Sequence, residues 1–220
     1  MFWRRKKIRC QFNKPIALST PIEKITFTVL DIEATGFNVG LHDRIIEIGA
    51  VKVEGLIVSR DTFHTYINPQ QEIPVEITEL TGIDEKTVQH APMALIGIKS
   101  LLQFMEKTQT LSIVGCNIIF DVTALEREMQ RANYAFVKPP MIDITDLIRF
   151  LNPTEDIRDL EQYACKFKTP RFKRHTALGD AFTTAHIFCY LLHKFKERGH
   201  NTWGELLYSL DCKNRNTVRF

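Results

Sequence analysis

The sequence predicts an α/β fold built on one mixed, five-stranded sheet flanked by helices. Three strand-like segments follow one another early in the chain, and helical and strand-like segments alternate after them. Consecutive strands joined by short turns pair antiparallel, whereas strands separated by helices pair parallel, so this order indicates a sheet of both kinds. The chain has 220 residues, 44% of them hydrophobic, which suffices for one large domain with extensions.

The first three strands are expected close together in the sequence. Residues 25–33 are rich in β-branched residues and almost continuously apolar, which is typical of a central, buried strand. Residues 44–54 predict a second strand, and residues 57–68 predict a third that ends before Pro69. Because only short turns separate these segments, we expect an antiparallel meander.

Helices and strands alternate after Pro74. The segment VEITELTGID at 75–84 predicts a short helix capped by Gly82, and Pro92 opens a longer helix with apolar residues at helical spacing. The remaining predicted elements are a strand at 111–117, a helix at 119–132, a strand at 141–145, a helix at 157–166, a helix at 176–195 and a C-terminal helix at 202–210.

We divide the chain into a basic N-terminal extension at 1–21, a main domain at 22–198 and a C-terminal helix and tail at 199–220. The extension carries five cations: Arg4, Arg5, Lys6, Lys7 and Arg9. No apolar stretch follows them, so they are not read as a secretion signal. A solvated tail and a nonspecific contact with phosphates or an acidic surface both explain this cluster.

The five cysteines do not indicate a disulfide framework. Their number is odd, they are scattered, and no CxxC pair occurs. This usage favours a reducing compartment and predicts a cytoplasmic protein. No run of 18 apolar residues is present, so the sequence predicts no membrane span.

An acidic pair stands at the end of the first predicted strand. Asp31 and Glu33 are two residues apart, so on a strand both carboxylates point to the same face. Two acids on a buried face repel each other and lose hydration unless a cation lies between them. A solvated strand end before the turn at Thr35 and Gly36 is the alternative explanation of this pair.

Two further acids and a histidine follow at the starts of predicted helices. Asp121 comes after the apolar strand at 111–117, where a helix N-terminus also tolerates a carboxylate. Asp180 lies in the first turns of the helix at 176–195, between Gly179 and Ala181. His175 and Asp180 would not share a face of one helix, so we expect His175 on a movable segment before it. Each residue alone is ambiguous, but all five together indicate a two-metal phosphodiesterase.

The chain resembles a known enzyme family at these residues. DIEATG, NIIFD and HTALGDA resemble the three motifs of the DEDDh 3′–5′ exonucleases, which include the epsilon proofreading subunit of bacterial DNA polymerase III, ribonuclease T and oligoribonuclease. RIIEIGAV, FHTYINP and LTGID resemble segments between the motifs. The resemblance covers residues 25–195. It implies the ribonuclease-H-like fold and identifies 22–198 as an exonuclease domain.

The resemblance also implies roles for individual residues. Asp31, Glu33, Asp121 and Asp180 would bind two Mg²⁺ or Mn²⁺ ions, and His175 would be the general base that deprotonates the attacking water. The reaction would release nucleoside 5′-monophosphates from the 3′ end of single-stranded DNA. The implied substrate-binding residues are Thr35, Gly36, Ile67, Thr81 and Phe120. For Ile67 and Phe120, core packing is an alternative.

Some residues depart from the family pattern, and several functions stay open. Ala34 replaces a frequent threonine, Cys116-Asn117-Ile118 replaces His-Asn-Ala, and CKFKTP replaces an arginine-leucine-glycine stretch. These changes leave every implied metal ligand in place. The alternatives are an exoribonuclease that trims RNA ends, a catalytically weak nucleic-acid-binding module, and a subunit that edits for a DNA polymerase partner in replication or repair.

Overall fold

A computed structural model of the chain describes residues 6–7, 16–154 and 159–215. Its main sheet has five strands in the order β4-β3-β2-β5-β7. The strands are β2 (Thr26–Ala34), β3 (Ile45–Glu54), β4 (Ile57–Tyr66), β5 (Ser112–Gly115) and β7 (Met141–Asp143). Strands β4, β3 and β2 pair antiparallel, and β2, β5 and β7 pair parallel. The predicted mixed sheet is therefore confirmed.

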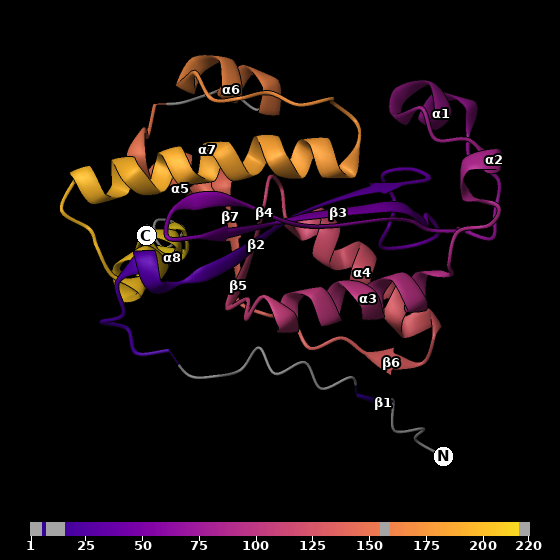
Figure 1. Cartoon of the computed structure of the whole chain (residues 1–220), viewed down its shortest axis with the longest axis horizontal. Helices are drawn as coiled ribbons and strands as arrows, with labels where there is room; N and C mark the ends of the chain where they lie inside the picture. Colours follow the sequence, from indigo (N-terminus) through magenta and orange to yellow (C-terminus); the bar gives the residue numbers. More distant parts are fainter. Residues whose placement is uncertain (1–5, 8–15, 155–158, 216–220) are drawn as a thin grey trace.

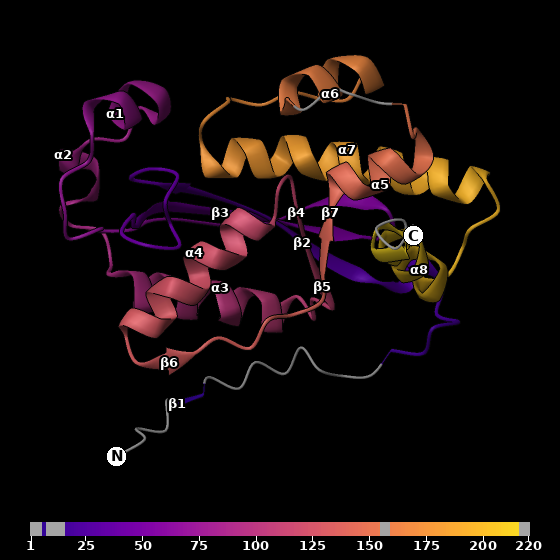
Figure 2. The same ribbon diagram turned by 180° about the vertical axis from the view of Figure 1, so that it is seen from behind.

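Helices cover both faces of this sheet (Figures 1 and 2). The long helix α7 crosses one face with α5 and α6 beside it, and α3 and α4 lie against the other face. The helices are α1 (Val75–Thr81), α2 (Glu85–Val88), α3 (Ala94–Lys107), α4 (Ile119–Arg131), α5 (Ile144–Leu151), α6 (Leu160–Phe167), α7 (Ala177–Glu197) and α8 (Trp203–Arg215).

The pleat of β2 divides its side chains between two cores. Phe27 and Val29 pack with residues of α7, whereas Leu30 and Ile32 pack with residues of α3 and α4. Because side chains two apart on a strand share a face, Asp31 continues the row of Phe27 and Val29. The acidic end of β2 therefore lies on the face that α7 covers.

Two helices were not predicted, and one strand is shorter than expected. The strand predicted at 141–145 ends at Asp143, because the Asp143 carboxylate accepts a hydrogen bond from the Thr145 backbone N–H and starts α5. In the same way, Asp84 caps the short helix α2. Helix α3 begins at Ala94, two residues after the proline that was expected to open it.

The ends of the chain join the fold in different ways. Helix α8 belongs to the core, because Trp203 and Leu206 are buried in the same cluster as Phe27. Within the basic N-terminal extension, β1 (Lys6–Lys7) pairs with β6 (Tyr134–Ala135), and residues 1–5 and 8–15 lie outside the described part. Among the described helices, none is long and apolar enough to cross a membrane.

The first turn of α7 lies directly against β3 at Gly49. A Cβ atom at this position would overlap the backbone of Ala177 and Leu178. Backbone atoms cannot swing away as a flexible side chain can, so only glycine permits this approach. The closeness fixes where α7 begins relative to the sheet.

We predict that Gly49→Ala destabilises the protein by about 1–3 kcal/mol, because α7 must move away from β3 to admit the methyl group. Urea unfolding measures this change. Gly40→Ala is the matched control, since its Cβ would lie 3.8 Å from the Thr123 methyl group, an ordinary contact. Equal unfolding free energies for the two variants would contradict the close approach.

Candidate active site

Four carboxylates converge on one cavity near the carboxyl end of β2. Asp31 and Glu33 come from β2, Asp121 from the first turn of α4, and Asp180 from the first turn of α7. All four line a cavity of about 360 Å³. The structure therefore brings together acids that are up to 149 positions apart along the chain.

Burial and mutual repulsion make this group of acids costly to ionise. Burial raises the pKa of Asp31 well above its ordinary value, and the charges of Asp121, Asp180 and Glu33 raise it further. Burial also raises the pKa of Asp121, as does the charge of Asp143. For Glu33, burial and then the charge of Asp180 raise the pKa to about 7. The charge of a bound cation would offset both effects.

Asp180 has one paired and one unpaired oxygen. Its Oδ2 accepts hydrogen bonds from Arg174 Nη1 at 2.5 Å and from the His175 backbone N–H at 3.2 Å. Its Oδ1 is buried and has no hydrogen-bond partner among the described residues. A buried, unsatisfied carboxylate oxygen is costly, and a metal ion is a natural partner for it.

The side chains present fit a divalent cation. Ligand atoms of Glu33, His175 and Asp180 lie within 4.8 Å of one another, close enough to share one ion. Carboxylate oxygens are the donors that Mg²⁺ and Mn²⁺ prefer. Asp31 and Asp121 lie in the same cavity outside this closest group. The site can therefore hold a metal ion.

His175 lies just outside α7, as the sequence predicted. It precedes Thr176, the residue that caps the helix, and its backbone has φ = 56°. This left-handed conformation is uncommon for a residue with a side chain and is retained where surrounding contacts demand it. The segment's movement, expected from the sequence, stays a prediction.

A buried glutamate that the sequence analysis did not select holds the start of α7. Glu47 on β3 accepts a hydrogen bond from the Ala177 backbone N–H at 2.8 Å through Oε2, and its Oε1 lies 2.6 Å from His64 Nε2. It is 2% exposed. Glu47 stands as a lone acid in the otherwise apolar segment IIEIGAV, and this feature of the sequence could have indicated its role. Glu47 acts on the site by fixing the turn that carries Asp180.

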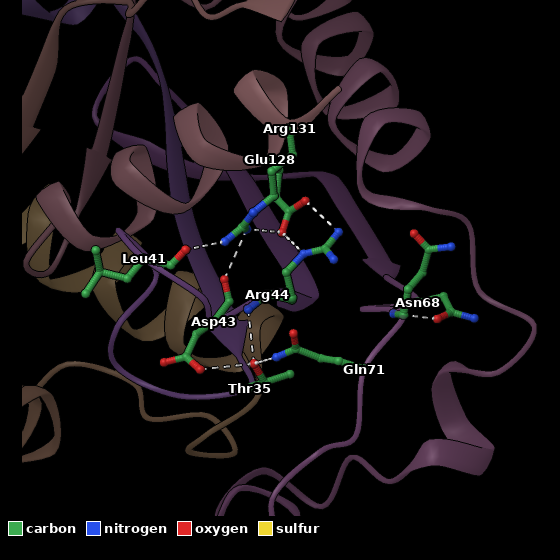
Figure 3. Close-up of polar contacts among 9 residues, drawn as sticks. Thr35, Leu41, Asp43, Arg44, Asn68, Gln71, Glu128 and Arg131 are labelled. Carbon is green, nitrogen blue, oxygen red and sulfur yellow. Dashed lines mark hydrogen bonds and ion pairs between the residues drawn. The ribbon is translucent and has the colours of Figure 1, made fainter. Parts of the chain in front are cut away.

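The predicted substrate-binding residues fall into two groups. Gly36, Thr81 and Phe120 line a smaller cavity of about 80 Å³, which shares Phe120 and Glu33 with the larger one. Thr35 lines neither cavity, and its hydroxyl accepts hydrogen bonds from the Arg44 backbone and the Gln71 side chain (Figure 3). Ile67 is fully buried among core residues, so packing accounts for it. Contact with substrate stays a prediction for all five.

The cavity also has walls that sequence reasoning missed. Phe37, which is 79% exposed, lines both cavities, and Asn117, Asp159 and Arg174 line the larger one. Cys116 lies there too, where burial first and then the charge of Asp143 raise its pKa to about 12. This thiol stays protonated near neutral pH, so it is not a nucleophile.

An ion cluster around the buried carboxylate of Glu128 ties the loop after β2 to α4 (Figure 3). Glu128 accepts hydrogen bonds from Arg44 Nε at 2.6 Å and from Arg131 Nη1 at 2.8 Å. Arg131 also donates to the backbone carbonyls of Leu41 and Asp43. Glu128 and Asp121 are seven residues apart and lie on the same side of α4. The cluster therefore fixes the loop that carries Phe37 relative to the helix that carries Asp121.

Comparison with known proteins finds one family across most of the chain. The RNase T family model, described as exonuclease, matches residues 28–188. A DNA polymerase III of PolC type from Caldanaerobacter subterraneus subsp. tengcongensis is 36% identical over 181 residues, 82% of this chain and 12% of the relative. A DNA polymerase III subunit epsilon-like protein from Rhodobacter capsulatus is 33% identical over 192 residues, 86% of this chain and 27% of the relative.

Solved structures confirm the predicted ribonuclease-H-like fold. The nuclease domain of 3′hExo, a DEDDh family member bound to rAMP, superposes with a TM-score of 0.66 at 20% identity. The match covers 77% of this chain and 92% of that domain. The chain spans at most about a quarter of the length of the two polymerase-related proteins.

The raised pKa of Glu33 predicts a pH-dependent stability in the metal-free protein. A carboxyl whose folded pKa is about 7, against an ordinary 4.5, contributes stability below pH 4.5 that is lost as the pH rises through 7. In EDTA, the unfolding free energy should fall by on the order of 2–3 kcal/mol between about pH 5 and about pH 7.5. Mn²⁺ should reduce this fall.

Urea unfolding at the two pH values measures this dependence. Glu33→Gln should lessen the fall in EDTA, because the variant has no proton to lose at this position. Glu76→Gln, a change at an exposed glutamate of α1, should keep the wild-type dependence. The same pH dependence in wild type and Glu33→Gln would contradict the proposed cause.

The ion cluster predicts that alanine substitutions at two glutamates of α4 reduce the stability by different amounts. Glu128→Ala leaves the partly exposed Arg44 and Arg131 without their shared carboxylate and should cost about 1–3 kcal/mol of stability. Glu126→Ala removes a partly exposed ion pair with Lys138 and should cost less than about 1 kcal/mol. Denaturant unfolding compares them, and similar losses would show that the cluster does not hold the loop.

Proposed function

This chain belongs to the RNase T exonuclease family, and we propose that it is a metal-dependent 3′–5′ exonuclease that releases nucleoside 5′-monophosphates from single-stranded DNA ends. The observation that carries the proposal is the cavity itself. It gathers Asp31, Glu33, Asp121 and Asp180. One buried oxygen of Asp180 has no hydrogen-bond partner in the part of the chain that the structure describes, and a ring nitrogen of His175 lies close to Glu33 and Asp180.

We assign Asp31, Glu33, Asp121 and Asp180 as the residues that would hold two divalent ions, Mg²⁺ or Mn²⁺. The raised pKa values of Asp31, Glu33 and Asp121 support this assignment, because the folded protein otherwise encloses mutually repelling acids. When bound, such a pair of ions supplies a nucleophilic water at neutral pH and stabilises charge on the attacking and leaving oxygens. The rest of the catalytic work falls to side chains of this chain.

His175 is the proposed general base. A ring nitrogen of His175 lies within 4.8 Å of carboxylate oxygens of Glu33 and Asp180, where it can accept a proton from the attacking water. Its backbone N–H bonds to Asp180, so the histidine and this carboxylate are positioned together. Glu47 acts behind them through Ala177 and does not meet the substrate.

The proposed place for the 3′-terminal nucleotide is the apolar side of the cavity. Phe37 and Phe120 line both cavities, and Gly36 and Thr81 line the smaller one. Exposed aromatic rings stack with nucleobases, and rings of this kind accept any base. Arg174, now bonded to Asp180, is a cation within reach of a phosphate in the same cavity.

We propose DNA as the substrate and a DNA polymerase as a partner because two of the most similar proteins are named for DNA polymerase III. A role in proofreading or repair follows from that context. Trimming of RNA ends uses the same chemistry and differs in how the cavity treats a 2′-hydroxyl. RNA is therefore included as a second substrate in the test.

The expected result is a ladder that shortens from the 3′ end of labelled oligonucleotides in Mg²⁺ or Mn²⁺ and is abolished by EDTA. Comparing the rates on matched DNA and RNA substrates shows which polymer the enzyme prefers. Asp180→Asn should remove activity, and His175→Ala should lower kcat about 10²–10⁴-fold. His193→Ala, at an exposed position on α7, should retain wild-type activity. No cleavage of either polymer in either metal would overturn the proposal.

A further inference from the structure

One wall of the cavity continues into a strongly basic stretch of chain. Residues 166–174, here called the basic segment, comprise the last two residues of α6 and most of its connection to α7, and they contain no acidic side chain. Their five cations are Lys166, Lys168, Arg171, Lys173 and Arg174. The first four are exposed and Arg174 is half-buried. The formal charge of the whole chain is only +3, so positive charge is concentrated here.

The backbone of the basic segment is held against α7. The Phe172 N–H donates to Thr183 Oγ1 at 3.1 Å, and the Phe172 ring stacks on Phe182 with centroids 4.9 Å apart. The Lys173 carbonyl accepts a hydrogen bond from Thr176 Oγ1. A Cβ at Gly179 would overlap that same carbonyl, so glycine permits the contact. The cations therefore project from a fixed scaffold.

The basic segment ends at the cavity. Arg174, its last residue, lines the same cavity as Phe37 and Phe120. In Figures 1 and 2 the connection from α6 to α7 and helix α1 lie near the same end of the sheet. A strand that enters this cavity thus meets both the apolar rings and the cation that ends the basic segment.

Two of the cations have no acidic partner in the described part of the chain. Arg174 pairs with Asp180, and Arg171 lies 3.3 Å from Glu161. No ion pair involves Lys168 or Lys173 among the described residues. Two exposed, unpaired ammonium groups on a fixed backbone are suited to bind phosphates.

We propose that the basic segment binds the sugar-phosphate backbone of the single strand that leads into the cavity, chiefly through Lys168 and Lys173. The strand is oriented with its phosphates toward this segment and its bases toward Phe37 and Phe120. Such contacts position a strand without reading its sequence, and they depend on salt. This inference rests on the proposed function, since it assigns how the same site receives its substrate.

The test uses a double variant, Lys168→Gln with Lys173→Gln, in the full chain. The control is Lys24→Gln with Lys107→Gln, two exposed lysines at the end of the sheet away from the cavity. Two substrates are compared in Mn²⁺: an oligothymidylate of about 12 nucleotides, and the p-nitrophenyl ester of thymidine 5′-monophosphate, which has no strand to bind. Fluorescence anisotropy with the same oligothymidylate in EDTA measures binding without hydrolysis.

The segment variant should raise KM for the oligothymidylate about 3–10-fold and reduce the salt slope of its binding by roughly 1.4, since each phosphate contact contributes roughly 0.7. Its rate on the small ester and its kcat should equal those of the control. Unchanged KM and salt slope would overturn the inference while leaving the exonuclease proposal intact. A wild type that binds with this lysine dependence but hydrolyses neither substrate would support the inference and overturn the proposed activity.

Discussion

The docking of α7 on β3 is the contact on which the site depends. Gly49 leaves no side chain between the strand and the first turn of the helix, and the Glu47 carboxylate accepts the N–H of Ala177. That turn carries Asp180, and His175 precedes it by two residues. If α7 began elsewhere on the sheet, the acids of β2 and the acid of α7 would not face one cavity.

Bringing these acids together in one cavity destabilises the folded protein electrostatically. The cavity encloses Asp31, Glu33 and Asp121, whose pKa values are raised by burial and by neighbouring acids. One buried oxygen of Asp180 has no hydrogen-bond partner among the residues that the structure describes. Arg174 offsets part of that repulsion through its bond to Asp180. Active sites commonly accept such costs, because the groups that repel in the free protein are those that bind a cation or a substrate.

Two walls of the cavity surround the acids, and different contacts hold each wall in place. The loop with Phe37 is tied to α4 by the ion cluster of Arg44, Glu128 and Arg131. The basic segment is tied to α7 by Phe172 and by the carbonyl of Lys173. Each wall is thus attached to a helix that also carries a carboxylate of the site. The groups that face the substrate therefore keep fixed positions relative to the acids.

The sequence by itself determined the mixed sheet, the shared face of Asp31 and Glu33, and the position of His175 ahead of α7, because these follow from local periodicity and from the pleat of a strand. The motifs also identified the exonuclease family. Only the tertiary structure decided that Glu47 supports α7, that Phe37 and Arg174 line the cavity, and that Ile67 is enclosed in the core. These facts depend on contacts between residues far apart along the chain, which no local pattern records.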